Sequence, residues 1–222
     1  LSFSENFFYM CFGKVPSKEI VKAFDVSLIL YAEHSFNVST FTARTITSSL
    51  SDIHGAITGA IASLKGPLHG GANEEVMHMM NKIKKPENAL KWINNALDRK
   101  EVIMGFGHRV YKKGDSRVPT MEKYFKKVSK IKNDKKFLKI YDTVKNVMIK
   151  RKDIHPNVDF PTGPTYHLMG FDTDFFTPIF VISRITGWSA HIMEQHAANK
   201  LIRPLSKYSG EKHRKVMLLN QR

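Results

Sequence analysis

A histidine in a glycine-rich segment is the first candidate for chemistry in this sequence. His69 lies in GPLHGGANEEV, residues 66–76, where glycines and a proline precede a helix-like run. Glycine leaves the backbone open to a ligand because it carries no side chain, and the following helix offers free N–H groups at its start. The segment favours a histidine that faces a small anionic ligand. A helix-linking turn with an incidental histidine accounts for these residues equally well.

Further ionisable residues occur in or near the Gly- and Pro-rich segments that we expect to be loops, IMGFGHRVYKKGDSR and HPNVDFPTGP. Arginine binds carboxylates through paired hydrogen bonds, neutral histidine polarises a carbonyl group, and a carboxylate removes a proton from a carbon next to a thioester or ketone. Such a set suits carbon–carbon bond formation on a carboxylated substrate. The candidates are His34, His69, His108, Arg117, Asp159, Arg184 and Arg203.

Other site chemistries have little support in the sequence. It contains no HExxH or CxxC motif and no pair of histidines four residues apart, so no metal site is predicted. It contains no GxSxG motif, and Cys11 lies in an apolar stretch, so a serine or cysteine nucleophile is equally unsupported. Arg184 lies inside an apolar run, where an unpaired charge is costly, and therefore requires a substrate carboxylate or a buried acid as its partner.

The composition is that of a globular chain with a strong excess of basic residues. Its 222 residues suffice for one domain, or for one large and one small domain, and the formal net charge is +15. Much of the excess lies in KKVSKIKNDKKFLK and KRK, on polar faces between apolar positions, without interleaved aromatic residues. This pattern favours a solvated lysine-rich surface over a nucleic-acid or membrane surface. The single Cys11 fits a reducing compartment, and the apolar run containing Arg184 is too short to span a membrane.

Helical periodicity extends over almost the whole chain, with no strand-like alternation, internal repeat or low-complexity linker, so the predicted class is all-α. The run at 177–201 is apolar on more than one side and predicts a buried helix. The Gly- and Ala-rich helix at 51–64 is expected to pack closely against another helix, between subunits. The predicted helical runs are 16–34, 51–66, 73–83, 86–97, 135–150 and 177–201.

The glycine-rich and arginine-bearing segments, taken in order, resemble the signature segments of the citrate synthase family. The matching segments are LILYAEHSFNVSTFTAR, GPLHGGANEEV, IMGFGHRVYKKGDSR, NVDFPTG, FTPIFVISRITGWSAHIMEQ and NKLIRP. The resemblance extends from about residue 6 to residue 210. Within the family, YHLMGFDTDFFTPIF and LIRPLS are most similar to 2-methylcitrate synthases. Members of the family carry many further residues before this region, so we expect a fragment, a processed chain or a shortened form.

The resemblance implies three catalytic residues. His69 would stabilise the enol of an acyl thioester, Asp159 would remove its α-proton, and His108 would polarise the carbonyl group of oxaloacetate. Three departures from the family pattern concern the neighbours of these groups rather than the groups themselves. Ser116 replaces the usual proline before Arg117, Ser35 stands where an acidic residue or glycine is common, and NVDFPTG has an uncommon continuation.

The resemblance also implies the groups that bind the two substrates. Those expected to bind oxaloacetate are His34, Arg117, Arg184 and Arg203, the last contributed by a partner subunit. Those expected to bind coenzyme A are Lys112, Lys113, Gly105, Phe106 and Gly107, the lysines near its phosphates and the backbone of 103–107 around its adenine. No metal and no permanently bound cofactor is implied, because acyl-CoA is itself the substrate.

The implied fold is all-helical, with a large and a small domain on either side of an active-site cleft, in a homodimer. Residues 1–72 would form the first part of the large domain, 73–170 the small domain, and 171–222 the return to the large domain. The implied activity is an acyltransferase reaction, propionyl-CoA plus oxaloacetate and water giving 2-methylcitrate, with or instead of acetyl-CoA giving citrate. No nucleic-acid or membrane partner is implied. A mitochondrial matrix and a bacterial cytoplasm both fit.

Two alternatives stay open on the sequence. The expected shortening and the basic charge are compatible with a catalytically silent helical protein that binds coenzyme A or a polyanion on the same scaffold. The charge alone is also compatible with a basic helical domain that binds nucleic acid.

Overall fold

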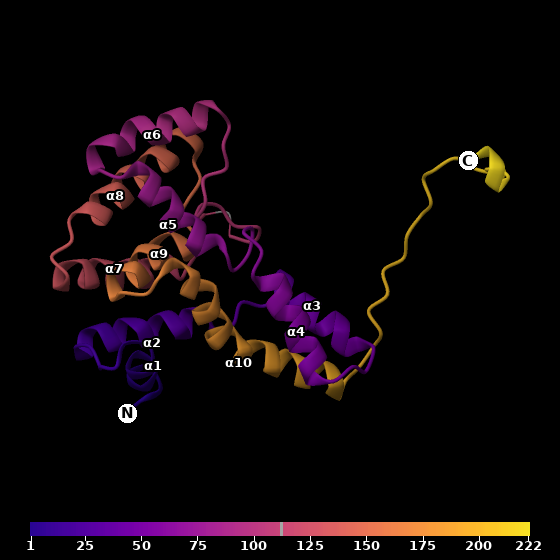
Figure 1. The fold of residues 1–222 in the computed structure, drawn as a ribbon, viewed down its shortest axis with the longest axis horizontal. Helices are drawn as coiled ribbons and strands as arrows, with labels where there is room; N and C mark the ends of the chain where they lie inside the picture. The colour runs from indigo at the N-terminus through magenta and orange to yellow at the C-terminus, as the bar shows by residue number, and fades with distance from the viewer. Residues whose placement is uncertain (112) are drawn as a thin grey trace.

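The computed structural model describes residues 1–111 and 113–222, and over this part of the chain it is all-α, which confirms the predicted class (Figure 1). No strand forms among these residues, and a single isolated bridge pairs Phe106 with Pro156. The helices are α1 Phe3–Phe12, α2 Lys18–Ala32, α3 Val38–Ser48, α4 Ile53–Leu64, α5 Ala72–Ile83, α6 Pro86–Asp98, α7 Val118–Ile131, α8 Lys136–Lys152, α9 Asp159–Met169 and α10 Phe176–Ala197, with 3-10 turns η1 Thr173–Phe175 and η2 Leu219–Gln221.

Side-chain caps fix the starts of α3 and α4, the two helices that precede the turn containing His69. At α3, the Asn37 side chain accepts a hydrogen bond from the Thr40 N–H at 3.0 Å. At α4, the Asp52 carboxylate accepts one from the Gly55 N–H at 2.8 Å. These bonds satisfy N–H groups that have no partner inside the helix. The capped first turn of α3 is also the part of that helix that contacts the candidate site.

The expectation of a loop over residues 155–164 is wrong in its second half, because α9 begins at Asp159. Proline is tolerated in a first helical turn, where its missing N–H would have no partner, and this accommodates Pro161. The helix continues past Pro164 because the segment is buried: a Cβ on Gly163 would lie 2.8 Å from the Asn73 carbonyl oxygen. Tertiary packing therefore overrides local propensity and places Asp159 at a helix N-terminus.

Two hydrophobic clusters hold the helices together. The first joins α1 and the first half of α2 to α5–α9, and the second packs α3 and α4 against α10 around the buried indole of Trp188. Figure 1 shows α3, α4 and α10 on the side away from α6 and α8. The candidate site is lined by Tyr31, Val158 and Phe180 of the second cluster and by Ile103 of the first, so it lies where the two clusters adjoin. The division into 1–72, 73–170 and 171–222 remains a prediction.

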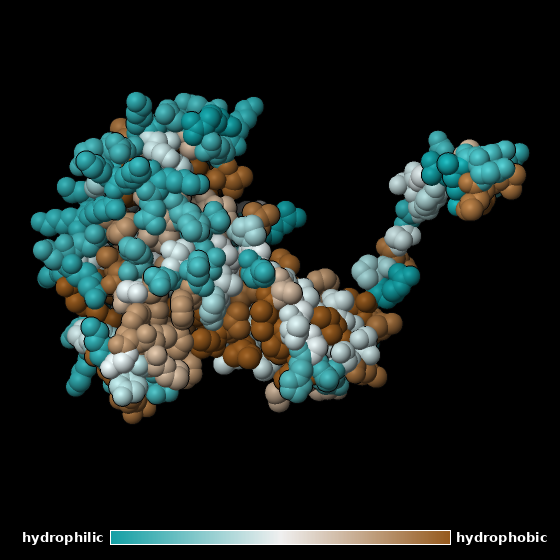
Figure 2. Space-filling view, viewed as in Figure 1, coloured by the Kyte–Doolittle hydropathy of each residue, from teal (hydrophilic) through white to brown (hydrophobic). Residues whose placement is uncertain are grey.

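The predicted helix at 51–64 packs closely against another helix of the same chain, α3, which confirms the close packing expected from its Gly and Ala residues. At Gly59 of α4, a Cβ would lie 2.2 Å from Ile46 Cδ1 of α3, so the small residue allows the two helices to approach. Its packing between subunits stays a prediction. Figure 2 shows hydrophobic residues gathered over α3, α4 and α10. The exposed hydrophobic residues of these three helices include Phe41, Ile53, Ile61 and Met193.

The basic residues of the lysine-rich segment lie on the solvent-exposed faces of α7 and α8. Lysines of the segment 126–139 face solvent on α7 and α8, whereas Val128 and Phe137 of the same segment are buried. Figure 2 shows hydrophilic side chains over α6–α8. None of the helices in the described chain is long and apolar enough to cross a bilayer.

Candidate active site

One pocket of about 550 Å³ brings together most of the predicted site residues. Its wall is formed by the end of α2, the turn before α5, the segment 102–111, the turn before α7, the start of α9 and α10. The volume suits a small organic ligand. The predicted site residues that line this pocket are His34, His69, Gly105, Phe106, Gly107, His108, Arg117, Asp159 and Arg184.

Asp159 is held by hydrogen bonds on both its backbone and its side chain. Its N–H donates to Asn157 Oδ1 at 3.1 Å, and its Oδ1 accepts a hydrogen bond of 2.6 Å from the hydroxyl of Tyr31. Burial raises the pKa of Asp159 to about 6, against the opposing effects of the Tyr31 hydrogen bond and the Arg117 charge. A carboxylate with a pKa near the working pH is suited to act as a general base.

Arg117 is oriented by a paired contact with Asp115. The guanidinium Nε lies 3.0 Å from Asp115 Oδ1 and Nη2 lies 2.7 Å from Oδ2, while the Arg117 backbone N–H also donates to Oδ1. Asp115 Oδ2 also accepts from the N–H of Val158, the residue before Asp159. Burial opposes ionisation of Asp115, but the Arg117 guanidinium and these N–H groups outweigh it and hold the pKa of Asp115 below its usual value. The turn that presents Arg117 is therefore held by Asp115, although Ser116 stands where the family usually has proline.

The hydrogen bonds assign the tautomers of His34 and His108. His108 Nδ1 accepts from the N–H groups of Val110 and Tyr111 at 3.1 and 3.2 Å, so its proton is assigned to Nε2. His108 Nε2 lies 2.9 Å from His34 Nε2 and donates to it, which assigns the His34 proton to Nδ1. Burial lowers the pKa of both rings, that of His34 to about 4 with a further contribution from Arg117. Both imidazoles are therefore neutral near pH 7.

His69 is oriented by Ser39 at the start of α3. The Ser39 N–H donates to His69 Nε2 at 3.3 Å, and the Ser39 hydroxyl lies 2.8 Å from the same nitrogen while accepting from the Trp188 indole N–H. These contacts assign the proton of His69 to Nδ1. Burial, and then the charge of Arg184, lower the pKa of His69 to about 4. His69 is thus a neutral donor whose Nδ1–H is available to a ligand.

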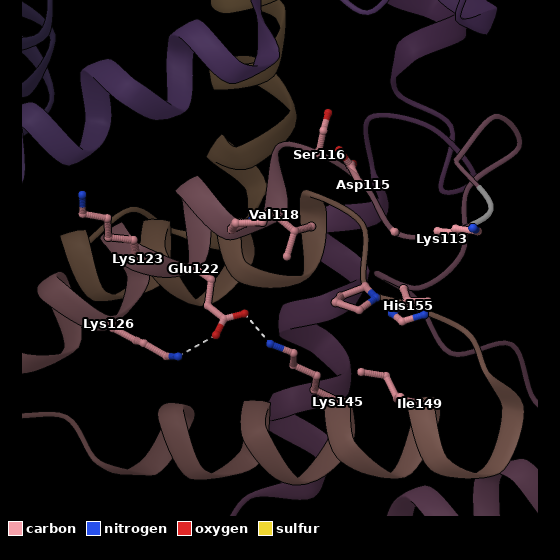
Figure 3. A pocket seen from close by; sticks show the side chains of 13 residues that line it. Lys113, Asp115, Ser116, Val118, Glu122, Lys123, Lys126, Lys145, Ile149 and His155 are labelled. Atoms are coloured by element: carbon pink, nitrogen blue, oxygen red, sulfur yellow. Dashed lines mark hydrogen bonds and ion pairs between the residues drawn. The ribbon is translucent and has the colours of Figure 1, made fainter.

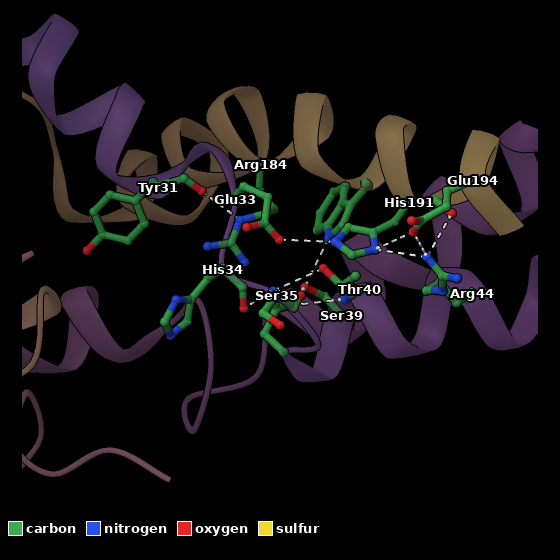
Figure 4. Close-up of polar contacts among 12 residues, drawn as sticks. Tyr31, Glu33, His34, Ser35, Ser39, Thr40, Arg44, Arg184, His191 and Glu194 are labelled. Atoms are coloured by element: carbon green, nitrogen blue, oxygen red, sulfur yellow. Dashed lines mark hydrogen bonds and ion pairs between the residues drawn. The ribbon is translucent and has the colours of Figure 1, made fainter. Parts of the chain in front are cut away.

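Arg184 lies in α10 with 1% of its surface exposed, as expected from its apolar surroundings. Its Nε donates to the carbonyl oxygen of Tyr31 at 2.6 Å (Figure 4). Its guanidinium lies over the Phe180 ring, 4.8 Å from the ring centroid. Its Nη1 is buried and has no hydrogen-bond partner within the described residues. Burial, and then the charge of Arg117, lower the pKa of Arg184 to about 10, which leaves it protonated at pH 7. A buried, protonated and incompletely bonded guanidinium is suited to a ligand carboxylate.

Two further predicted residues, Arg203 and Lys113, do not line this pocket. Arg203 is exposed in the tail that follows α10, where it donates to the carbonyl oxygen of Pro204. Lys113 lines a second pocket, of about 820 Å³, which lies between α7 and α8 and contains Glu122 paired with Lys126 and Lys145 (Figure 3). Lys112 lies outside the described residues. The substrate-binding roles of all three stay predictions.

The sequence did not predict the residues that orient the candidate groups, namely Tyr31, Ser39 and Asp115. Tyr31 carried no specific signal, because its place in the apolar spacing of 16–34 indicates a core residue and His34 lies beyond the end of α2. Asp115 stands two residues before Arg117, within reach of a turn. Ser39 had no local signal, because its partner His69 is thirty residues away in the chain.

Comparisons with known proteins identify the family of the chain. A family model described as "Citrate synthase, C-terminal domain" matches residues 1–205. The chain therefore belongs to the citrate synthase family. It is 57% identical to 2-methylcitrate synthase 2 of Corynebacterium glutamicum over all of this chain and 59% of that protein, and 56% identical to citrate synthase of Mycolicibacterium smegmatis over 98% of this chain and 58% of that protein.

Solved structures show the same likeness. The chain superposes with a TM-score of 0.92 and 38% identity on citrate synthase from the archaeon Thermoplasma acidophilum, a structure described as a ternary complex with carboxymethyl coenzyme A and oxaloacetate. The match covers all of this chain and 60% of that one. The chain thus spans about three-fifths of the length of these relatives.

Proposed function

We propose that the protein condenses oxaloacetate with an acyl-CoA thioester, forming 2-methylcitrate from propionyl-CoA and citrate from acetyl-CoA. The observation that carries the proposal is one pocket that holds a carboxylate with a pKa of about 6, three neutral histidines, and Arg117 and Arg184 among its arginines. The family membership and the names of the relatives support the same reaction. The motifs and the pocket do not determine whether propionyl-CoA or acetyl-CoA is preferred, because one methylene in an apolar pocket changes the binding free energy by only about 1–3 kcal/mol.

In the proposed reaction, Asp159 takes a proton from the α-carbon of the thioester. A thioester α-proton is far less acidic than a carboxylic acid, so the negative charge that develops on the thioester oxygen requires stabilisation as the proton leaves. The Nδ1–H of His69 is the group assigned to that oxygen. The resulting enol carbon attacks the ketone carbon of oxaloacetate, and hydrolysis of the thioester product releases the tricarboxylate and coenzyme A.

Oxaloacetate would be held and activated by the other charged and polar groups of the pocket. The Nε2–H of His108 would polarise the ketone oxygen of oxaloacetate, and His34 would also hydrogen-bond to oxaloacetate. Arg117 and Arg184 would bind its carboxylates, Arg184 through the Nη1 group that has no protein partner among the described residues. Arg203 would complete this set from a partner subunit.

The coenzyme A portion would lie along the open rim of the pocket. Leu68 and Val102 are exposed there, at 86% and 77% of their surface, and the backbone of Gly105 to Gly107 lines the same side. Exposed apolar side chains at a pocket rim are suited to a large ligand that covers them on binding. Lys112 and Lys113 would lie near its phosphates.

Domain closure and dimer formation are part of the proposal. The pocket walls come from segments assigned to both predicted domains, so movement of 73–170 against the rest would exclude water from the reacting groups. The exposed apolar residues over α3, α4 and α10 would be covered in a homodimer.

The decisive experiment measures thiol release with the protein expressed from its complete reading frame. We expect free thiol from propionyl-CoA and from acetyl-CoA only when oxaloacetate is present, and loss of that release in Asp159→Asn. Coenzyme A binding without oxaloacetate-dependent release would instead support the catalytically silent alternative and contradict the proposed reaction.

A further inference from the structure

Tyr31 makes two contacts with the candidate site through two different groups. Its hydroxyl donates to Asp159 Oδ1 at 2.6 Å, and its backbone carbonyl oxygen accepts a hydrogen bond of 2.6 Å from Arg184 Nε. Figure 4 shows the Arg184 guanidinium next to the Tyr31 carbonyl group. The residue joins α2 to the start of α9 and to α10, which are far apart in the sequence.

The ring of Tyr31 is fixed in place. Only 1% of the residue is exposed, and the ring packs edge-to-face on Phe180 at a centroid distance of 4.2 Å. Burial, and then the negative charge of Asp159, hold the pKa of Tyr31 well above its usual value, so the hydroxyl stays protonated and donates. An O–H···O⁻ bond of this length is strong and directional.

The hydrogen bond from the Tyr31 hydroxyl makes the two carboxylate oxygens of Asp159 differ in their availability to a ligand. Oδ1 is occupied by the donor, so Oδ2 is the oxygen available to accept a proton from a ligand. Because the donor is fixed by packing, the rotation of the carboxylate is fixed with it.

We propose that Tyr31 is a positioning residue for the condensation, which aims the Asp159 carboxylate with its hydroxyl and the Arg184 guanidinium with its carbonyl oxygen. The inference rests on the proposed function of the pocket. In this proposal, Tyr31 alone sets the position of Asp159, the base, relative to Arg184, one of the arginines that bind the substrate carboxylates.

Several charged and titratable groups affect Asp159 besides Tyr31. Arg117 and Arg184 stabilise its ionised form, whereas Asp115 opposes it, and the buried Tyr166 of α9 lies near enough to respond to its charge. Among the side chains of the described residues, Tyr31 is the one that makes a hydrogen bond to the Asp159 carboxylate. Removing that donor should therefore raise the protonation midpoint of Asp159.

The test compares Tyr31→Phe with Tyr166→Phe. Tyr166 is an equally buried tyrosine whose hydroxyl donates to Ser27 Oγ at 3.0 Å, so the control loses the same group without touching Asp159. For Tyr31→Phe we expect kcat to fall by about 10- to 100-fold, which is the loss typical of a hydrogen bond to a charged group. The acidic limb of the kcat–pH profile should move to higher pH, while the KM for oxaloacetate stays close to the wild-type value, because the carbonyl that holds Arg184 is retained.

A readout without turnover separates this inference from the proposed function. The ¹³C resonance of the Asp159 carboxyl group, identified by its absence in Asp159→Asn, reports the protonation midpoint directly. We expect the midpoint to rise in Tyr31→Phe and to stay unchanged in Tyr166→Phe. Replacement of Tyr31 by 3-fluorotyrosine keeps the ring and strengthens the donor, so it should lower the midpoint even if the phenylalanine variant does not fold.

An Asp159 midpoint that is the same in the wild type, Tyr31→Phe and the 3-fluorotyrosine form would overturn the inference. A rise in the KM for oxaloacetate with unchanged kcat in Tyr31→Phe would overturn it as well. Absence of oxaloacetate-dependent thiol release in the wild type would contradict the proposed function, and a shifted Asp159 midpoint would still support the placement of the carboxylate by Tyr31.

Discussion

His34 and His108 lie with their Nε2 atoms 2.9 Å apart, so in this structure each imidazole is the hydrogen-bond partner of the other. The rings come from the end of α2 and from the segment before α7, and both line the candidate site. A ligand oxygen that accepts a hydrogen bond from His108 Nε2–H must therefore replace this contact.

We expect a structure with oxaloacetate to show His34 and His108 no longer bonded to each other, with His108 Nε2 on the ketone oxygen. The physical reason is that His108 keeps its proton on Nε2 as long as Val110 and Tyr111 donate to its Nδ1. An oxaloacetate complex in which the 2.9 Å contact persists would contradict the assigned roles.

His108→Ala should lower kcat by about 10²- to 10³-fold, the loss seen when one preorganised donor to a developing oxyanion is removed. Steady-state thiol release with saturating oxaloacetate measures the effect. His54→Ala serves as the control, because His54 is exposed on α4 and does not line the site. Equal losses in the two variants would argue against a polarising role for His108.

Arg184→Met should abolish the stabilisation of the fold by oxaloacetate. A ligand that binds the folded state raises the midpoint of thermal unfolding, and the buried guanidinium is one of the groups assigned to the oxaloacetate carboxylates. Without ligand, two effects on stability oppose each other: methionine removes the Nη1 nitrogen that has no partner in the described chain, but it also loses the Arg184 Nε hydrogen bond to the Tyr31 carbonyl oxygen. The test is therefore the change in the unfolding midpoint that oxaloacetate causes in each protein. The prediction fails if oxaloacetate raises the midpoint of both proteins equally.

The reaction should lose its rate below about pH 6. Asp159 acts as a base only when it is ionised, and its pKa is about 6. Well below this pH, kcat/KM, which reports the pKa of the free enzyme, should fall about tenfold for each pH unit. A kcat/KM–pH profile recorded between pH 4.5 and 8 tests this, and a profile that is flat through pH 6 would show that Asp159 does not act as the base.

Asp159→Asn should stabilise the fold near pH 7 and have little effect at pH 4. The folded-state pKa of Asp159, about 6, is raised above the ordinary value of 3.8, so the folded protein binds the proton more tightly than the unfolded chain. The stability contributed by the protonated group is fully present below pH 3.8 and is lost as the pH rises through about 6. Thermal unfolding of both proteins at pH 4 and pH 7.5 measures the difference. The exposed Asp174→Asn should show no such pattern.

Gly187→Ala should lower the free energy of unfolding by about 1–3 kcal/mol, the usual cost of forcing extra atoms into a packed contact. A Cβ at Gly187 of α10 would lie 2.4 Å from the Ala32 carbonyl oxygen, which is backbone at the end of α2 and cannot rotate away. Gly66→Ala is the matched control, because its nearest neighbour would be 3.6 Å away. Denaturant unfolding of the two variants measures the difference, and equal stabilities would contradict this account of the α2–α10 contact.

The sequence predicted helix positions correctly where apolar residues were regularly spaced. The prediction was wrong where tertiary packing determined the start of a helix. The runs over 73–83 and 86–97 match α5 and α6 closely, because their apolar residues repeat with the helical period and face one core. The start of α9 was missed, because Pro161 and Pro164 argue locally against a helix and only burial against α5 outweighs them.

The sequence by itself determined the all-α class and the types of group that the pocket contains, because periodicity and residue chemistry are properties of local order along the chain. Only the tertiary structure decided how these groups act. The neutral state of the histidines, the raised pKa of Asp159 and the orientation of its carboxylate by Tyr31 depend on burial and on partners distant in the chain. Tyr31 and Asp159, for example, are 128 residues apart. Electrostatics and hydrogen bonding depend on distance in space, which local sequence does not specify.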